Sequence, residues 1–185
     1  MSLVIESKGE NDMVYLLALL FNIFLLIFGV WTILLIITLF HEMGHAFMYK
    51  MFFRDKYWHI EVGRGRTIIK LRKFTIRIIP ASGFFHFDPQ SKGTKIQYIM
   101  TYLGGPLASL LIVVLTILQL QLTKASDLTI QQENWVWFLE FAFWASFCSF
   151  VLTILPIKYP HGYLKGLDSD ALRALNCALE KPSKD

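Results

Sequence analysis

The chain has 185 residues, of which 55% are hydrophobic and 17% are charged, and its formal net charge is +4. This composition excludes a disordered chain and a coiled coil. It also argues against an ordinary soluble domain, because so few polar residues could not cover so many apolar ones. The length suits one domain, residues 1–185. The two cysteines offer neither a disulfide framework nor a zinc ribbon.

Three long apolar runs predict three membrane-spanning helices, at about residues 14–49, 96–122 and 135–157. Long stretches of the first two runs carry no charge, and Glu140 is the only charged residue in the third. A bilayer core needs about 20 apolar helical residues, and lipid offers backbone groups no partner outside the helix itself. We therefore expect an integral membrane protein that crosses the lipid bilayer three times.

Between the first two runs, residues 57–90 are predicted to form a small antiparallel sheet. Residues 69–72 and 74–78 alternate apolar and basic side chains, which is the period of a half-buried strand. Gly63 and Gly65 precede them as turn signals. The expected fold is an all-α membrane protein with three core transmembrane helices and a small membrane-associated antiparallel β-sheet between the first and the second.

The charges that flank the spans predict the orientation. From Lys50 to Lys95 the chain holds more than half of its 18 Lys and Arg residues, whereas the segment before the first span is mainly acidic. Cytoplasmic loops carry an excess of basic residues, so the sheet and the C-terminal segment 158–185 are expected in the cytoplasm and the N-terminus outside. A membrane explains these basic residues better than nucleic acid, so we expect no nucleic-acid partner. The small size favours a prokaryotic cell membrane.

The end of the first span carries the residues that point to chemistry. His41 and His45 are four residues apart, so on a helix they share one face and can hold one zinc ion. Glu42 lies beside them, where it is placed to take a proton from a metal-activated water. Ionisable residues inside a membrane helix are costly, and Glu42 is the only charged residue between Met13 and Tyr49. This pattern predicts a hydrolytic zinc site.

A catalytic zinc usually has a third protein ligand as well as water. In the predicted topology the first and third spans run in the same direction. Residues just after Pro156 are therefore expected on the same side of the membrane as the histidine pair. The candidates there are His161, Asp168 and Asp170.

Together these features resemble the site-2 protease family of intramembrane zinc metalloproteases. That family has a His-Glu-any-any-His motif in a membrane helix, followed by a membrane-associated sheet with a Pro-any-any-Gly stretch, which Pro80 and Gly83 match here. Its next core helix carries a Gly-Pro motif, here Gly105 and Pro106. Its third core helix ends in Asn-any-any-Pro, and an Asp-Gly pair beyond it supplies the third zinc ligand.

The chain departs from the family pattern at three places. Ser109 stands where an Asn usually follows the Gly-Pro motif, and Thr153 stands where an Asn precedes Pro156. The Asp-Gly pair is absent, and the usual spacing from Pro156 leads to His161. A longer spacing leads to Asp170.

We expect Asp170 to be the third ligand, with His161 as the main alternative and Asp168 as a further one. Asp170 follows Ser169, a suitable helix cap, and opens a good helical run, as the family's aspartate does. The glycines and proline of the intervening loop, 158–167, can absorb the extra length.

The resemblance implies a zinc-dependent intramembrane endopeptidase that cleaves a transmembrane segment of a membrane protein near the cytoplasmic side. Zn²⁺ would be held by His41, His45 and Asp170, and Glu42 would be the catalytic residue. The alternative is a non-catalytic membrane-embedded homologue that binds or sequesters membrane-protein partners. The replaced asparagines and the missing Asp-Gly pair favour that alternative.

Overall fold

The structure is a computed structural model, and it describes residues 2–53, 57–87, 93–124, 130–161 and 164–179. Its elements, in chain order, are α1 (Ser2–Phe52), β1 (Trp58–Lys70), β2 (Phe74–Phe87), α2 (Lys95–Lys124), α3 (Ile130–Ile154) and α4 (Asp170–Leu179). The chain is thus mostly helical, with a two-stranded antiparallel sheet between the first two long helices, as the sequence predicted.

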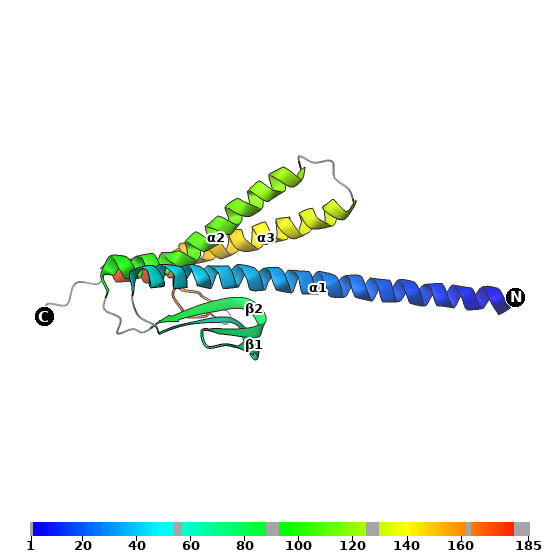
Figure 1. Ribbon diagram of the computed structural model, residues 1–185, viewed down its shortest axis with the longest axis horizontal. Coiled ribbons are helices and arrows are strands. Elements are labelled where there is room, and N and C mark those ends of the chain that lie inside the picture. The colour runs from blue at the N-terminus through cyan, green and yellow to red at the C-terminus, as the bar shows by residue number, and fades with distance from the viewer. Residues whose placement is uncertain (1, 54–56, 88–92, 125–129, 162–163, 180–185) are drawn as a thin grey trace.

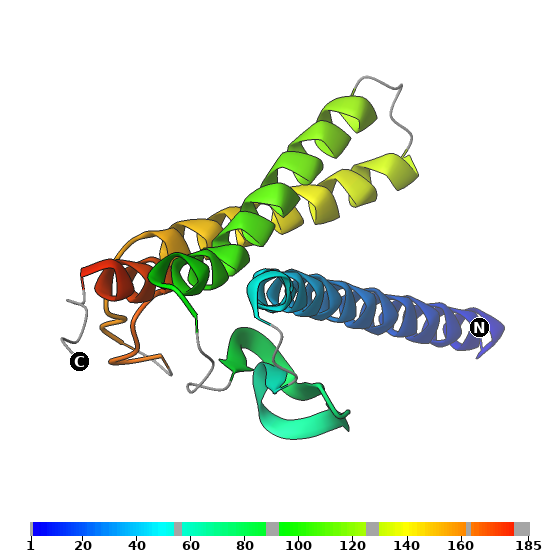
Figure 2. The ribbon, with the colours of Figure 1, turned by 60° about the vertical axis from the view of Figure 1, so that its left-hand side comes forward.

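Helix α1 is the longest element and extends along the whole molecule in Figure 1. The sheet lies on one side of it, and α2 and α3 lie on the other (Figures 1 and 2). The helix continues through the histidine motif because no proline interrupts it. It therefore carries the motif on the same rigid element as the first apolar run.

Three helical segments are long and apolar enough to cross a membrane: Asp12–Phe52, Lys95–Thr123 and Trp135–Ile154. In the first and third, only 6% of the most apolar window is buried inside the protein. Such exposed apolar surface is costly in water, so these helices need an apolar environment. The third helix ends at Ile154 rather than at Ile157, because Pro156 disfavours a helical conformation in the residue before it.

The sheet is more strongly bent than two simple strands. Residues 60–62 of β1 lie beside residues 83–85 of β2 and also beside residues 74–76. The bend follows Gly63 and Gly65, whose φ angles of 87° and 83° lie in the left-handed region that favours glycine. The sequence predicted these glycines as turns before a strand, whereas the structure places them inside β1.

Helix α1 also holds β2 in place. Trp31 Nε1 donates to the carbonyl of Ile78 at 2.7 Å, and Thr38 Oγ1 donates to the carbonyl of Pro80 at 3.1 Å. Below them, Ala46 packs against two buried residues of β1. These contacts bring the part of β2 that follows Pro80 alongside the histidine motif.

Helices α1 and α2 cross at glycines. A Cβ built on Gly44 would overlap the carbonyl oxygen of Gly104, and a Cβ on Gly104 would overlap the carbonyl oxygen of Gly44. The two backbones therefore meet without side chains between them, as small residues allow in helix pairs. This close crossing brings Gly105, the next residue of α2, directly beneath the histidine pair.

Candidate metal centre

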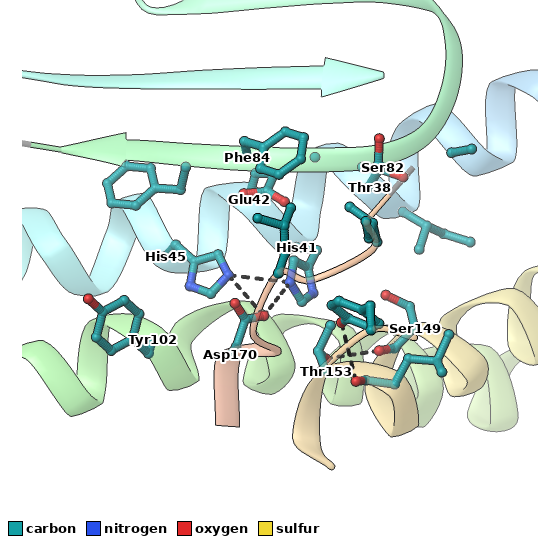
Figure 3. Close-up of a pocket in the computed structure, with 18 of the residues that line it drawn as sticks. Thr38, His41, Glu42, His45, Ser82, Phe84, Tyr102, Ser149, Thr153 and Asp170 are labelled. Atoms are coloured by element: carbon teal, nitrogen blue, oxygen red, sulfur yellow. Dashed lines mark hydrogen bonds and ion pairs between the residues drawn. The ribbon is translucent and has the colours of Figure 1, made fainter. Parts of the chain in front are cut away.

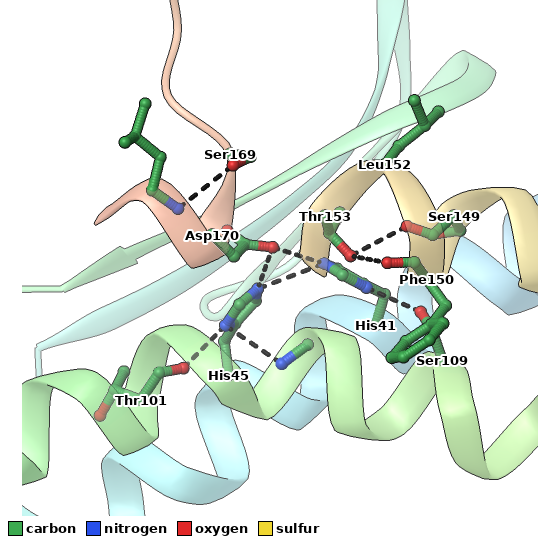
Figure 4. Close-up of polar contacts among 12 residues, drawn as sticks. His41, His45, Thr101, Ser109, Ser149, Phe150, Leu152, Thr153, Ser169 and Asp170 are labelled. Carbon is green, nitrogen blue, oxygen red and sulfur yellow. Dashed lines mark hydrogen bonds and ion pairs between the residues drawn. The ribbon is translucent and has the colours of Figure 1, made fainter. Parts of the chain in front are cut away.

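Three side chains from distant parts of the chain converge on one point. His41 and His45 lie one turn apart on α1, and Asp170 is the first residue of α4. Asp170 Oδ2 lies 3.1 Å from His41 Nε2 and 3.4 Å from His45 Nε2, and the two Nε2 atoms are 3.3 Å apart (Figure 4). Both imidazoles are buried and the carboxylate is partly buried. The structure thus brings the three predicted ligands together as a group that could bind a metal ion.

The Nδ1 atoms of both imidazoles, which face away from Asp170, contact residues of α2. His45 Nδ1 lies 2.8 Å from the carbonyl oxygen of Thr101, and His41 Nδ1 lies 2.8 Å from Ser109 Oγ. The Gly105 N–H also approaches His45 Nδ1, at 3.3 Å, but the carbonyl is closer and can only accept. Neutral His45 therefore carries its proton on Nδ1 and keeps a lone pair on Nε2. The Ser109 hydroxyl allows His41 the same tautomer. Both rings are thus oriented with Nε2 toward Asp170, as second-shell partners orient metal-binding imidazoles.

The spacing and chemistry of these atoms fit a metal ion. Ligands at zinc distances in a tetrahedral arrangement lie about 3.3 Å from one another, close to the separations observed here. Burial raises the pKa of the Asp170 carboxyl, but without a metal ion protonated Nε2 groups of His41 and His45 donate to it and attract its charge, which holds its pKa below the ordinary value. A bound cation would take the place of those protons. An ionised carboxylate and two nitrogen lone pairs facing one point form a suitable donor set for a divalent cation.

The backbone of α2 closes the site from below. A Cβ built on Gly105 would overlap the Nε2 atoms of both His45 and His41. Only glycine therefore leaves the imidazoles their present positions. The two adjacent glycines of α2 therefore differ in role. In the structure Gly104 packs against α1 and Gly105 forms the wall.

Asp170 owes its position to Ser169. This buried serine caps α4, because its Oγ accepts from the backbone N–H of Leu172 at 3.2 Å, which confirms the predicted cap. The same hydroxyl donates to the carbonyl of Leu155 at 2.6 Å, just beyond the end of α3. A β-bridge between Lys158 and Asp168 closes the connecting loop. The start of α4 is thereby tied to the end of α3.

The other predicted candidates for the third ligand do not belong to this group. Asp168 lies 3.7 Å from Lys158 Nζ and accepts from Asn176 at 3.3 Å. His161 is exposed and lines a different cavity, together with Arg64 of β1. Among the residues that the structure describes, only His41, His45 and Asp170 form a possible metal-binding group of three.

Comparison with known families identifies the chain. The sequence model of peptidase family M50 matches residues 29–126, which is more than half of the chain. The chain belongs to peptidase family M50. This confirms the predicted resemblance to the site-2 protease family. A search of the curated proteins found no match.

Membership of family M50 adds to what the helices indicate. Peptidases of this family are zinc metalloproteases, and three long apolar helices are typical of an integral membrane protein. The matched segment contains both histidines of the motif and Gly105, but it ends before Asp170. The place of Asp170 beside the imidazoles therefore comes from the structure.

In this M50 chain Glu42 points toward the sheet rather than toward α2 (Figure 3). Its side chain is 5% exposed and lies against Gly83 of β2, where a Cβ would overlap the carboxylate. A cavity of about 400 Å³ joins Glu42 to the two imidazoles and to Asp170. A carboxylate and three possible metal ligands thus face one space, which is the arrangement that metal-assisted hydrolysis requires.

Two features of the site were not foreseen from the sequence. Ser109 was noted only as a replaced Asn, yet it is fully buried and holds His41. A hydroxyl residue within an apolar helix, one turn beyond Gly105, was the available signal. Thr153 lines the cavity where the family has Asn, and its hydroxyl bonds carbonyls of its own helix, at 2.9 Å for Ser149 and 3.2 Å for Phe150.

Proposed function

We propose that this member of family M50 is a zinc-dependent intramembrane endopeptidase that cleaves a transmembrane segment of another membrane protein. The observation that carries the proposal is the convergence of His41, His45 and Asp170 beside Glu42 in one cavity. A relative that had lost its activity would have no need to keep this combination. The replacement of two family asparagines left the metal-ligand group intact.

His41 and His45 would hold zinc through Nε2, and Asp170 would hold it through a carboxylate oxygen. Two histidines and one carboxylate are an established ligand set of catalytic zinc. Bound there, zinc lowers the pKa of a water molecule and polarises the scissile carbonyl. Thr101 and Ser109 keep the imidazoles aimed at the site throughout the reaction.

Glu42 is the general base in this proposal. It takes the proton from the attacking water and later gives it to the leaving amine. The carboxylate needs a fixed position for both transfers. Gly83 supports this role, because its missing side chain leaves the space that Glu42 occupies.

The substrate is held in an extended form beside β2. A helical substrate has its carbonyls engaged in its own hydrogen-bond ladder, so it must unwind before hydrolysis. Residues 80–85 of β2 line the cavity, whereas the carbonyl of Ile78 is engaged by Trp31. An unwound segment could pair with the part of β2 that faces the cavity, as peptides add to sheet edges elsewhere.

Cleavage occurs near the cytoplasmic side in this proposal. The N-terminus lies outside and the C-terminal segment in the cytoplasm. Exposed basic residues of the sheet support this orientation, since cytoplasmic loops are rich in Lys and Arg. They are Arg64, Arg66 and Lys70 of β1, together with Arg72 in the turn between the strands.

The test compares membranes from cells that produce the wild-type chain or the Glu42→Gln variant. Mass spectrometry of protein N-termini should find new termini inside transmembrane segments only with the wild type. Both proteins should contain about one zinc per chain, because Glu42 is not a ligand. If the wild type retains zinc and yields no such termini, the non-catalytic alternative replaces the protease proposal.

A further inference from the structure

The cavity of the metal centre continues into a second cavity of about 240 Å³. Both are bounded by β2 on one side and by α3 and the loop that follows it on the other. They are adjacent parts of one cleft, because five residues line both: Ala81, Ser82, Leu152, Tyr159 and Leu164. A substrate that lies along β2 would therefore pass from one cavity into the other.

The two cavities differ in charge. The first contains the carboxylates of Glu42, Asp168 and Asp170. The second contains Arg64 and His161, and no carboxylate belongs to the described residues that line it. Its charged and titratable groups are thus hydrogen-bond donors suited to an anion.

One hydroxyl group adds to this donor set. Ser82 Oγ is buried and has no hydrogen-bond partner among the residues that the structure describes. A buried hydroxyl without a partner is costly, so an acceptor from a ligand would relieve that cost. The phenol of Tyr159, which also lines the cavity, already donates to the carbonyl of Leu152 at 3.3 Å.

We propose that the second cavity binds an acidic side chain, Asp or Glu, of the substrate polypeptide. A carboxylate accepts several hydrogen bonds at once, and Arg64, His161 and the Ser82 hydroxyl supply donors from three separate segments. His161 is thereby a specificity residue rather than a metal ligand. This inference rests on the proposed protease function, because it concerns the same substrate.

The sheet register gives the distance of this acidic residue from the scissile bond. Gly83, which lies against Glu42, pairs with Val62, while Ile79 pairs with Arg64. The backbone of Arg64 thus lies four residues along β2 from Gly83, or about 13 Å of extended chain, and this is an upper limit because Ala81 and Ser82 line both cavities. The acidic side chain should lie within about four residues of the cleaved bond.

The experiment measures peptide binding to the full-length chain in detergent, loaded with zinc and carrying Glu42→Gln to prevent cleavage. The probes are fluorescent ten-residue peptides of Ala and Leu, each with one Glu at a different position, and their Gln analogues. At one or two positions the Glu peptide should bind about tenfold more tightly than its analogue, as a charge-assisted hydrogen bond would give. Added Arg64→Gln or His161→Asn should remove most of this preference.

Matched variants test whether Arg64 and His161 cause the preference for Glu peptides. Arg72→Gln removes an exposed basic residue that lines neither cavity, and it should leave the preference unchanged. Arg64→Glu should instead favour a peptide with Lys at the same position. Equal binding of Glu and Gln peptides at every position, a preference that survives Arg64→Gln with His161→Asn, or no binding of any peptide would overturn the inference. Failure of wild-type cleavage with the Glu preference retained would overturn the protease proposal alone.

Discussion

The two sides of the metal centre are assembled in different ways. The histidine side depends on one turn of α1 and on the backbone of α2 that crosses it. The carboxylate side depends on Ser169, which ties the start of α4 to the end of α3. Only the histidine side lies within the segment that matches family M50. This difference suggests that the sequence on the carboxylate side can vary, provided that the fold still places an aspartate beside the two imidazoles.

The largest effect is expected from removing that aspartate. Asp170→Ala should weaken zinc affinity by more than about 100-fold, since loss of a mere outer-shell partner costs 10–100-fold. His161→Ala and Asp168→Asn should retain about one zinc per chain, because neither residue belongs to the ligand group. Measuring the zinc content of the purified variants shows which of these residues is the third ligand. Metal loss in His161→Ala with retention in Asp170→Ala would mean that the carboxylate side is wrongly assigned.

The two sides were not equally predictable from the sequence. The spacing of His41 and His45 is a local property of a helix, so the sequence sufficed to place them on one face. The position of Asp170 depends on where α3 ends and how the following loop folds back. Helix capping by Ser169 favoured Asp170 over His161, but no local rule could bring the carboxylate to the imidazoles.

Long-range packing also explains what was missed. Ser109 holds His41 only because α1 and α2 cross closely at Gly44 and Gly104, and the sequence does not give a crossing angle. The bend of β1 at Gly63 likewise depends on strand pairing with two parts of β2. The order of helices and sheet was predictable because it follows from apolar runs and local alternation.

The next largest effect separates the two adjacent glycines of α2. Gly105→Ala should lower zinc affinity about tenfold or more, because the new methyl group overlaps both imidazoles. Gly104→Ala should instead lower the free energy of unfolding, because it separates α2 from α1. Alanine improves helix propensity at both positions, so propensity alone cannot explain a loss. Calorimetric zinc titration and thermal unfolding in detergent measure the two effects. An equal response of both variants would contradict the division of roles.

A smaller effect should distinguish the serine on each side. Ser109→Ala removes the partner of His41 Nδ1 and should weaken zinc binding by roughly 10–100-fold with little change in folding. Ser169→Ala removes a helix cap and the partner of the Leu155 carbonyl, so it should destabilise the chain by roughly 1–3 kcal/mol. Hydrogen exchange should then rise in α4 but not in α1. Increased exchange in α1 instead would show that the two sides are not independent.

The smallest effect concerns the packing of β2 on α1, which involves none of the metal ligands or their hydrogen-bond partners. Trp31→Phe keeps an aromatic ring but removes the donor to the Ile78 carbonyl, a net loss of about 1 kcal/mol. Hydrogen exchange of β2 amides should increase about fivefold, while zinc content stays unchanged. Trp144→Phe is the matched control, because Trp144 is an exposed side chain of α3 that does not line the cavity. Reduced zinc content in Trp31→Phe would mean that the sheet supports the metal ligands themselves. Unchanged zinc content with altered substrate binding would instead assign the sheet to the substrate, as a strand that positions an extended segment beside Glu42.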